Sequence, residues 1–303
     1  MTPSAFTNLP GVVEFREYRG RDARVPMLLL EVPHGATRAL HYDALRAELV
    51  GSYPSDLRDF FFVNTDVGAP ELAIAIAEAS VAIDPRAYVV VARCLVPRTF
   101  VDCNRVIDAS LSGAAGAVTP GLHDYVRDAR DRELLLRRHA AYVESVEAAY
   151  ERILGASGLA MMVHTYAPRS LDVVVDERIV DRLRAEYQSE RIGSWPLRPD
   201  VDLIADDAAG RRLASPDLVA ALQTAGGKLG YEVASSSTYH LHDATYAARF
   251  AQRYEGRTLC FEVRRDHLVR EFTPFDEMHA DPERVASLAR AIAEALPRCG
   301  CAA

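Results

Sequence analysis

Short apolar runs alternate with longer amphipathic segments along most of the chain. A short apolar run bounded by turn residues is typical of a buried strand, and apolar positions that recur every three or four residues are typical of a helix. On this basis we expect buried strands at 27–32, 60–63, 88–92, 159–163 and 258–263, an edge strand at 12–18, and helices at 42–50, 70–80, 123–154, 244–253 and 282–296. Strands that alternate with helices predict a mixed, mostly parallel sheet with helices on both faces, a three-layer α/β fold.

The segment between residues 169 and 243 follows this pattern less clearly. It contains a candidate strand at 171–175 and candidate helices at 177–187 and 216–227. The sequence of 303 residues shows no internal repeat and no low-complexity linker. We therefore expect a single domain over residues 1–303, with 169–243 as a less regular insertion.

Composition and charge narrow the class of protein. Hydrophobic residues make up 49% of the chain and charged residues 26%, which is ordinary for a globular protein. The formal net charge of −8 argues against a nucleic-acid partner, because phosphate binding needs a basic face. The arginines between 127 and 138 are interleaved with acids, as is typical of a solvated helix face.

We expect the protein to be cytoplasmic and not bound to a membrane. The N-terminus lacks the basic region, apolar stretch and small-residue cleavage site of a signal peptide. The apolar run at 27–32 is too short to cross a membrane. The five cysteines show no CxxC spacing, and their odd number fits reduced thiols better than a disulfide framework. Nothing in the sequence indicates the oligomeric state.

Four side chains that can bind a metal or transfer a proton stand at or near the ends of expected strands. His34, Asp66 and His164 each follow one of these strands, and Glu262 lies inside the last one. Because the carboxyl ends of parallel strands meet at one edge of a sheet, we expect these side chains to lie together. Two histidines and one carboxylate can hold zinc with one position open, and a second carboxylate can act as general base. The set therefore predicts a site for metal-assisted hydrolysis of an amide.

Each of these residues also has a structural explanation that the sequence leaves open. Glu262 could form a salt bridge with Arg264 or another arginine, since a buried carboxylate needs a partner. Asp66 could cap the helix that begins at Pro70. The histidines could be structural residues, and the chain has no HExxH motif to tie them to a metal.

The segment Val101-Asp102-Cys103-Asn104-Arg105 carries candidate substrate-binding residues. Arg105 can bind a carboxylate through two parallel hydrogen bonds, and Asn104 can donate another. Asp102 could orient the guanidinium group of Arg105 for this purpose. The alternative is a purely structural ion pair between Asp102 and Arg105.

Two further arginines and two loops complete the candidate site. Arg98 and Arg169 are looser candidates for binding the same carboxylate. The small-residue segment 110–120 could gate the site. His240 and His242, at alternate positions, could form a second metal or substrate contact, although such a pair is more often a surface loop feature.

Taken in chain order, several short motifs resemble those of the N-formylglutamate amidohydrolase family. They are Val32-Pro33-His34-Gly35, Asn64-Thr65-Asp66, Arg98 with Val101-Asp102-Cys103-Asn104-Arg105, His164-Thr165-Tyr166 and Phe261-Glu262-Val263-Arg264. The resemblance implies a hydrolase-like fold related to that of zinc carboxypeptidases and aspartoacylases. It also implies one zinc ion per chain, or another divalent metal. In that scheme the metal ligands are His34, Asp66 and His164, the general base is Glu262, and the substrate carboxylate is bound by Asn104 and Arg105. Apart from the resemblance, Arg98 could stabilise the oxyanion beside the metal.

The chain departs from the family pattern at three places. The family usually has a serine after the first histidine, whereas this chain has Gly35 and Ala36. No acid precedes His164, so its orientation would depend on a backbone carbonyl or on Glu31. Zinc carboxypeptidases place a glutamate three residues after the first histidine, and here that position is Thr37.

These observations together predict a zinc-dependent amidohydrolase of amino-acid metabolism. We expect it to cleave the N-acyl bond of a small carboxylated amino acid such as N-formylglutamate. Two alternatives remain: a zinc carboxypeptidase or peptidoglycan amidase, and a metal-free protein that binds a carboxylate on the same fold.

Overall fold

A seven-stranded mixed sheet forms the centre of the protein. The computed structural model describes residues 6–107 and 119–297. The strands are β1 (Val13–Arg19), β2 (Leu28–Val32), β3 (Tyr88–Cys94), β4 (Leu159–Tyr166), β5 (Val201–Ile204), β6 (Val233–Ser235) and β7 (Thr258–Arg264). Their order across the sheet is β1-β3-β2-β4-β7-β5-β6. Only the pairs β1–β3 and β5–β7 are antiparallel, so the predicted mixed, mostly parallel sheet is confirmed.

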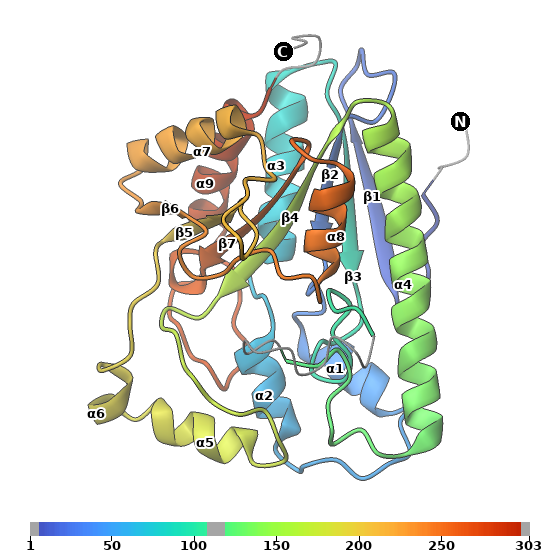
Figure 1. Ribbon diagram of the computed structural model, residues 1–303, viewed down its shortest axis with the longest axis vertical. Helices are drawn as coiled ribbons and strands as arrows, with labels where there is room; N and C mark the ends of the chain where they lie inside the picture. The colour runs from blue at the N-terminus through green and yellow to red at the C-terminus, as the bar shows by residue number, and fades with distance from the viewer. Residues whose placement is uncertain (1–5, 108–118, 298–303) are drawn as a thin grey trace.

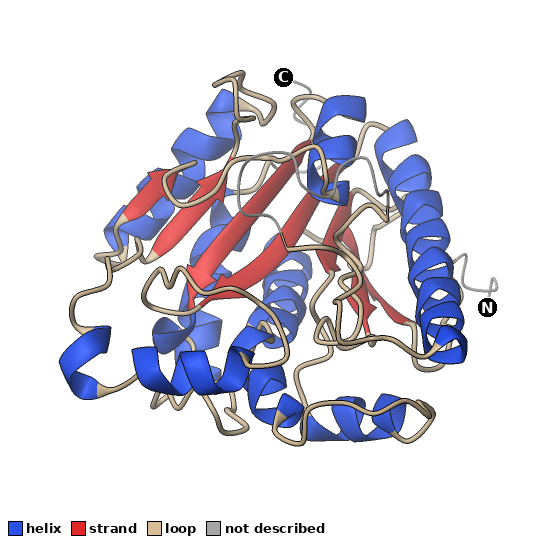
Figure 2. Ribbon diagram, turned by 60° about the horizontal axis from the view of Figure 1, so that its bottom comes forward, coloured by secondary structure: helices blue, strands red, loops and turns tan. Residues whose placement is uncertain are grey.

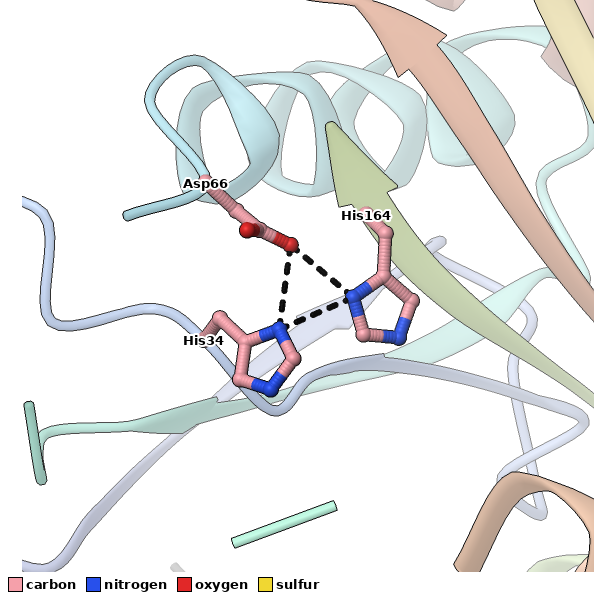
Figure 3. Close-up of side chains that lie close together, drawn as sticks. All are labelled: His34, Asp66 and His164. Carbon is pink, nitrogen blue, oxygen red and sulfur yellow. Dashed lines mark hydrogen bonds and ion pairs between the residues drawn. The ribbon is translucent and has the colours of Figure 1, made fainter. Parts of the chain in front are cut away.

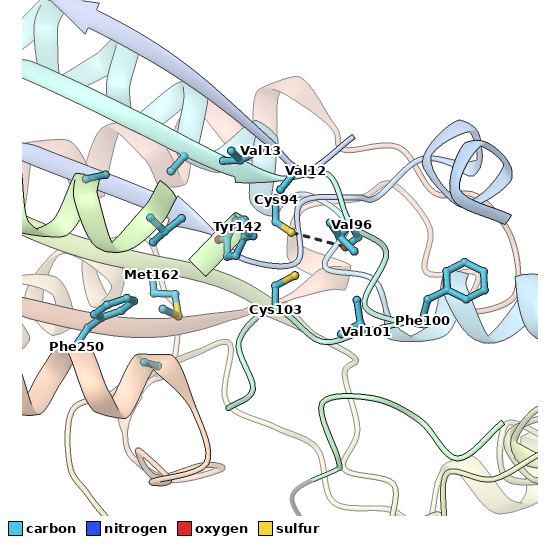
Figure 4. Packing of buried hydrophobic residues seen from close by; sticks show 14 of the residues in the cluster. Val12, Val13, Cys94, Val96, Phe100, Val101, Cys103, Tyr142, Met162 and Phe250 are labelled. Atoms are coloured by element: carbon cyan, nitrogen blue, oxygen red, sulfur yellow. Dashed lines mark hydrogen bonds between the residues drawn. The ribbon is translucent and has the colours of Figure 1, made fainter. Parts of the chain in front are cut away.

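Helices cover both faces of this sheet (Figures 1 and 2). The helices are α1 (Ala39–Arg46), α2 (Leu57–Asn64), α3 (Ala69–Ile83), α4 (Ala129–Gly155), α5 (Ile179–Glu186), α6 (Ser189–Ile192), α7 (Pro216–Lys228), α8 (Tyr246–Arg253) and α9 (Pro282–Ala295). One apolar core lies under α4 and α8, where Tyr142, Met162 and Phe250 pack together (Figure 4). A second core lies between the other face and α3, α7 and α9. These two cores make the three-layer α/β fold that the sequence predicts.

Strand β2 shows why the central strands could be predicted from the sequence. Its five residues, Leu-Leu-Leu-Glu-Val, are all buried, because neighbours β3 and β4 flank it and helices cover both its faces. Pro33 follows it and directs the chain into the turn that carries His34. Gly35 then passes so close to β3 that a Cβ atom would lie 2.9 Å from the carbonyl oxygen of Cys94. Glycine at this position allows the turn to fold against the end of β3.

Most of the remaining predicted elements are present. The edge strand at 12–18 is β1, and the helices at 42–50, 70–80, 123–154, 216–227, 244–253 and 282–296 correspond to α1, α3, α4, α7, α8 and α9. The helix at 177–187 corresponds to α5. Helix α3 begins after Gly68, whose φ of 89° favours glycine, and has Pro70 in its first turn.

The strand predicted at 60–63 is wrong, because these residues form the second half of α2. Phe60, Phe61, Phe62 and Val63 are all buried, so the run is apolar on every side of the helix. A continuous apolar run of four residues has no period that could distinguish a buried helix from a buried strand. Asp66 therefore follows a helix and not a strand.

The region 169–243 contributes more to the sheet than expected. The strand predicted at 171–175 is wrong: these residues form no strand, and Val174 is 67% exposed. Strands β5 and β6, which the sequence pattern did not reveal, extend the sheet beyond β7. Both are very short, and β5 carries the buried Asp202 in its middle, which hides its apolar character.

One stretch, Leu57–Ile83, is long and apolar enough by composition to cross a membrane. It comprises α2 and α3, which residues 65–68 separate, and 78% of its most apolar window is buried inside the fold. We therefore interpret α2 and α3 as core helices of the fold.

Candidate metal centre and substrate-binding site

Three buried side chains converge at the carboxyl edge of the parallel strands. His34 lies on the turn after β2, Asp66 lies between α2 and α3, and His164 lies in β4 (Figure 3). The Nδ1 atoms of His34 and His164 are 3.1 Å apart. Oδ2 of Asp66 lies 3.2 Å from Nδ1 of His34 and 2.9 Å from Nδ1 of His164. The three residues are between 2% and 4% exposed, so all three are shielded from water.

Asp102 fixes the proton of His34 on the nitrogen that points away from this cluster. Its Oδ1 atom lies 2.8 Å from Nε2 of His34 and also accepts a hydrogen bond from the backbone N–H of Asn104. Burial alone would raise the pKa of Asp102, but His34 and Arg98 hold it well below its usual value. The Asp102 carboxylate is therefore ionised, and the Nε2–H group of His34 donates to it.

The proton on Nε2 leaves the Nδ1 lone pair of a neutral His34 facing the cluster. There it meets Oδ2 of Asp66, which is also an acceptor, and Nδ1 of His164. Acceptors at these distances repel each other unless a cation lies between them. The donor set, two imidazoles and one carboxylate, is the kind that holds zinc at catalytic sites. A tetrahedral zinc ion separates its ligand atoms by roughly 3.3 Å, close to the distances in this cluster. The residues present thus fit a divalent metal.

The carboxylate of Asp66 is held from its other side by two arginines. Its Oδ1 atom lies 3.5 Å from Nη1 of Arg98 and 3.6 Å from Nη2 of Arg265. The backbone N–H of Thr165 approaches Oδ2 at 3.3 Å. Burial alone would raise the pKa of Asp66, but the nearby His34 and His164 lower it well below its usual value. Asp66 is not a side-chain cap of α3, because that helix makes no side-chain hydrogen bond at its N-cap, Gly68.

Glu262 lies beside His164 on the neighbouring strand. The two residues are register partners in the parallel pair β4–β7, so both side chains point to the same face of the sheet. Arg264 does not pair with Glu262, because its guanidinium group binds Asp200 and Asp266 instead. Among the described residues, the buried Oε2 atom of Glu262 has no hydrogen-bond partner. Burial raises the pKa of this carboxyl to about 7, although His164 opposes the shift. A carboxyl group with an unsatisfied oxygen beside candidate metal ligands is suited to proton transfer.

Asn104 and Arg105 are positioned by contacts that leave their donors open. Oδ1 of Asn104 accepts a hydrogen bond from the backbone N–H of Ala247 in the first turn of α8, so its amide NH2 group can point elsewhere. The Nε atom of Arg105 is buried and has no hydrogen-bond partner among the described residues. Its nearest carboxylate oxygen is Oδ2 of Asp102, at 4.0 Å. The guanidinium group of Arg105 is therefore only weakly neutralised and can accept an anionic ligand.

Asp102 pairs more closely with Arg98 than with Arg105. Nη2 of Arg98 lies 3.0 Å from Oδ2 of Asp102, against the 4.0 Å separation of the Arg105 pair. The same guanidinium group approaches Asp66, so Arg98 connects two carboxylates that contact His34. This places Arg98 directly beside the candidate metal ligands.

The structure does not bring every candidate residue to this cluster. Arg169 donates a hydrogen bond to the backbone carbonyl of Trp195, and its described contacts include none of the clustered residues. His240 and His242 lie in a loop, where His240 is exposed and Nδ1 of His242 accepts from a backbone N–H. Glu31 accepts hydrogen bonds from Tyr142 and Tyr150, and no described hydrogen bond joins it to His164. Most of the proposed gate at 110–120 lies outside the described residues.

Three residues of the site carry roles that the sequence pattern did not reveal. Asp102 is the partner of His34, Arg265 is a partner of Asp66, and Arg198 acts on Glu262 by its charge. Asp102 lies in the loop that follows β3, the neighbour of β2 in the sheet, and this position is a signal that could have suggested a contact with His34. No local sequence pattern indicated the contact of Arg265 with Asp66 or the effect of Arg198 on Glu262.

The sequence matches no family model and no curated protein, but solved structures share its fold. N-formylglutamate amidohydrolase from Ralstonia eutropha JMP134 is 19% identical, with 93% of this chain and 95% of that chain covered and a TM-score of 0.51. The gene product Atu2144 from Agrobacterium tumefaciens is 17% identical, with coverages of 93% and 92% and a TM-score of 0.51. The fold of this chain is therefore that of an N-formylglutamate amidohydrolase, in agreement with the resemblance in the sequence.

Proposed function

We propose that this protein is a metal-dependent hydrolase that cleaves the N-acyl amide bond of a small carboxylated amino acid. The observation that carries the proposal is the convergence of His34 Nδ1, Asp66 Oδ2 and His164 Nδ1, with Glu262 in register beside His164. The shared fold with an N-formylglutamate amidohydrolase supports the same class of reaction.

His34, Asp66 and His164 would hold the metal, with Zn²⁺ as the first candidate because its preferred ligands match this set. When bound, such an ion acidifies water and polarises the carbonyl oxygen of the amide. Glu262 takes the proton of the attacking water on its free Oε2 atom and passes it to the leaving nitrogen. Arg98, which already contacts Asp66 and Asp102, stabilises negative charge on the carbonyl oxygen.

The substrate carboxylate binds to Arg105, whose guanidinium group has open donors, with a further bond from the amide of Asn104. Both residues belong to the segment that also carries Asp102. One short loop thus positions the hydrogen-bond partner of a metal ligand, His34, and the anchor of the substrate. This arrangement fixes the distance between the substrate carboxylate and the scissile bond.

The first experiment is elemental analysis of the purified wild type and of His34→Ala, prepared without added metal. His279→Ala serves as a matched control, because His279 is exposed and contacts Arg38, away from the cluster. We expect about one divalent metal ion per chain in the wild type and the control, and loss of the ion in His34→Ala.

Hydrolysis of N-formyl and N-acetyl amino acids is then compared with hydrolysis of short peptides. Activity confined to peptides would indicate a carboxypeptidase in place of an amidohydrolase. A wild type that binds neither endogenous nor added metal, yet binds a carboxylate, would contradict the enzyme proposal and indicate a binding protein.

A further inference from the structure

The two oxygen atoms of the Asp66 carboxylate face different groups. Oδ2 lies 3.2 Å from Nδ1 of His34 and 2.9 Å from Nδ1 of His164 (Figure 3). Oδ1 lies 3.5 Å from Nη1 of Arg98 and 3.6 Å from Nη2 of Arg265. A carboxylate can bind a metal ion through one oxygen or through both. The groups that hold Oδ1 therefore determine how many coordination positions Asp66 can occupy.

Arg265 is a buried cation that depends on Asp66 for its counter-charge. It lies directly after β7, in the 3-10 turn Arg265–His267, and is 4% exposed. In the described part of the chain, Asp66 is the only carboxylate within ion-pair distance of it. Burial lowers the pKa of Arg265, and the charge of Asp66 opposes this shift. Because a buried charge is costly without an opposite charge, Arg265 and Asp66 stabilise each other.

Three hydrogen bonds fix the position of the Arg265 guanidinium group. Nη1 donates to the backbone carbonyl of Val63 in the last turn of α2, and Nη2 donates to the backbone carbonyl of Thr165 at 3.1 Å. Nε donates to Oγ1 of Thr165 at 3.4 Å, and that hydroxyl in turn donates to the carbonyl of Val67. Arg265 thus joins the chain on both sides of Asp66 to the end of β4, next to His164.

The other arginine at Oδ1 is less firmly committed to Asp66. The closest carboxylate to Arg98 is that of Asp102, at 3.0 Å, and the side chain of Arg98 is 23% exposed. The described hydrogen bonds and ion pair of Arg265 involve none of the residues proposed to bind the substrate. Any effect of Arg265 on the site must therefore pass through Asp66 and the segments beside it.

We infer that Arg265 is a positioning residue that keeps Oδ1 of Asp66 turned away from the metal, so that Asp66 binds the ion through Oδ2 alone. The inference rests on the proposed function, in which Asp66 is one of three ligands and a further position stays open. Without the charge of Arg265, Oδ1 loses a buried partner, and the metal becomes the nearest strong positive charge in its place. Asp66 then binds through both oxygens and fills the open position.

The test adds Co²⁺ to the metal-free wild type and to Arg265→Met. Visible absorption by Co²⁺ is intense at a four-coordinate site and weaker at a five-coordinate site, so the spectrum reports the open position without any turnover. We expect the wild type to give the intense four-coordinate spectrum, from three protein ligands and one water. Arg265→Met has a long side chain without charge. We expect this variant to lose the intense absorption and to give a five-coordinate spectrum.

Three further variants make the result specific. Arg264→Met is the matched control, because Arg264 is the neighbouring arginine and pairs with Asp200 and Asp266, and it should keep the wild-type spectrum. Arg265→Lys keeps a positive charge and should restore most of the intense absorption. Arg265→Gln is neutral but keeps N–H donors for the carbonyls of Val63 and Thr165. It should also give the five-coordinate spectrum, and it decides the matter if Arg265→Met fails to fold.

The outcomes separate this inference from the proposed function. A four-coordinate spectrum in the neutral variants would overturn the inference and leave the proposed function intact. The same holds if the variants only lower the melting temperature of the metal-free protein, as a purely structural role of Arg265 predicts. A five-coordinate spectrum in the wild type would also overturn the inference. A wild type that takes up no Co²⁺ would contradict the proposed function and the inference together.

Discussion

The Nε2 atom of His34 lies 2.8 Å from Oδ1 of Asp102, and this contact determines which nitrogen of the histidine faces the metal site. The two residues follow β2 and β3, which are neighbours in the parallel sheet. Their contact is therefore a direct product of the topology. It makes Asp102 an indirect determinant of metal binding, since it holds the Nδ1 lone pair of His34 toward Asp66 and His164.

The substitution Asp102→Asn tests this relationship. A neutral amide is a weaker acceptor for the Nε2–H group of His34 and no longer neutralises Arg98. Loss of such a supporting partner lowers metal affinity by about 10- to 100-fold in metalloenzymes. Competition with a chelator of known affinity measures the change. Asp124→Asn, an exposed position in the same region, should leave the affinity unchanged. Equal affinities for all three proteins would contradict the role of Asp102.

The substitution Glu262→Gln should separate proton transfer from metal binding. The amide cannot accept a proton from water, so we expect kcat to fall by about 10²- to 10⁴-fold. Metal content should stay at the wild-type level, because Glu262 is not one of the three clustered ligands. Glu232→Gln, on the exposed surface, is the control. A variant that keeps its activity, or loses its metal, would show that Glu262 is not the general base.

The sequence was sufficient to predict the site residues that lie in, or directly after, strands with a clear apolar pattern. His34 follows β2 and His164 lies in β4, and both strands are apolar runs buried on both faces. The helix α2 was mistaken for a strand because four consecutive buried residues carry no period. The partners of these residues were harder to predict. The contact between Asp102 and His34, and that between Arg265 and Asp66, join segments that no local pattern relates.

His139 is expected to act on substrate binding through Arg105. Its Nε2 atom lies 2.7 Å from the backbone carbonyl oxygen of Arg105, and burial lowers the pKa of the histidine, which favours a neutral ring that donates this hydrogen bond. Loss of one such bond costs about 1 kcal/mol, so His139→Leu should raise KM roughly fivefold with little change in kcat. His139→Gln, which retains a donor, should restore most of the affinity. A parallel fall in kcat and stability without a change in KM would indicate a purely structural role.

His123 makes the stability of the fold depend on pH. The residue is 5% exposed, stacks on Tyr125 and packs edge-on against Phe60, and its Nδ1 atom has no hydrogen-bond partner among the described residues. Burial lowers its pKa from 6.5 to about 4. The folded protein therefore keeps the ring neutral, while the unfolded chain takes up a proton below pH of about 6.5.

The pKa of His123 is lower in the folded protein than in the unfolded chain, so its contribution to stability is fully present above pH of about 6.5. This contribution is lost as the pH falls toward 4. The shift corresponds to about 3 kcal/mol across the window. His41, whose pKa is also lowered to about 4 by burial, adds a similar dependence, so the comparison must be made with a variant. His123→Phe keeps the aromatic packing and removes the titrating group. We expect urea unfolding at pH 7 and pH 5 to show a smaller loss of stability in His123→Phe than in the wild type. An identical loss in both proteins would mean that His123 is protonated in the folded state.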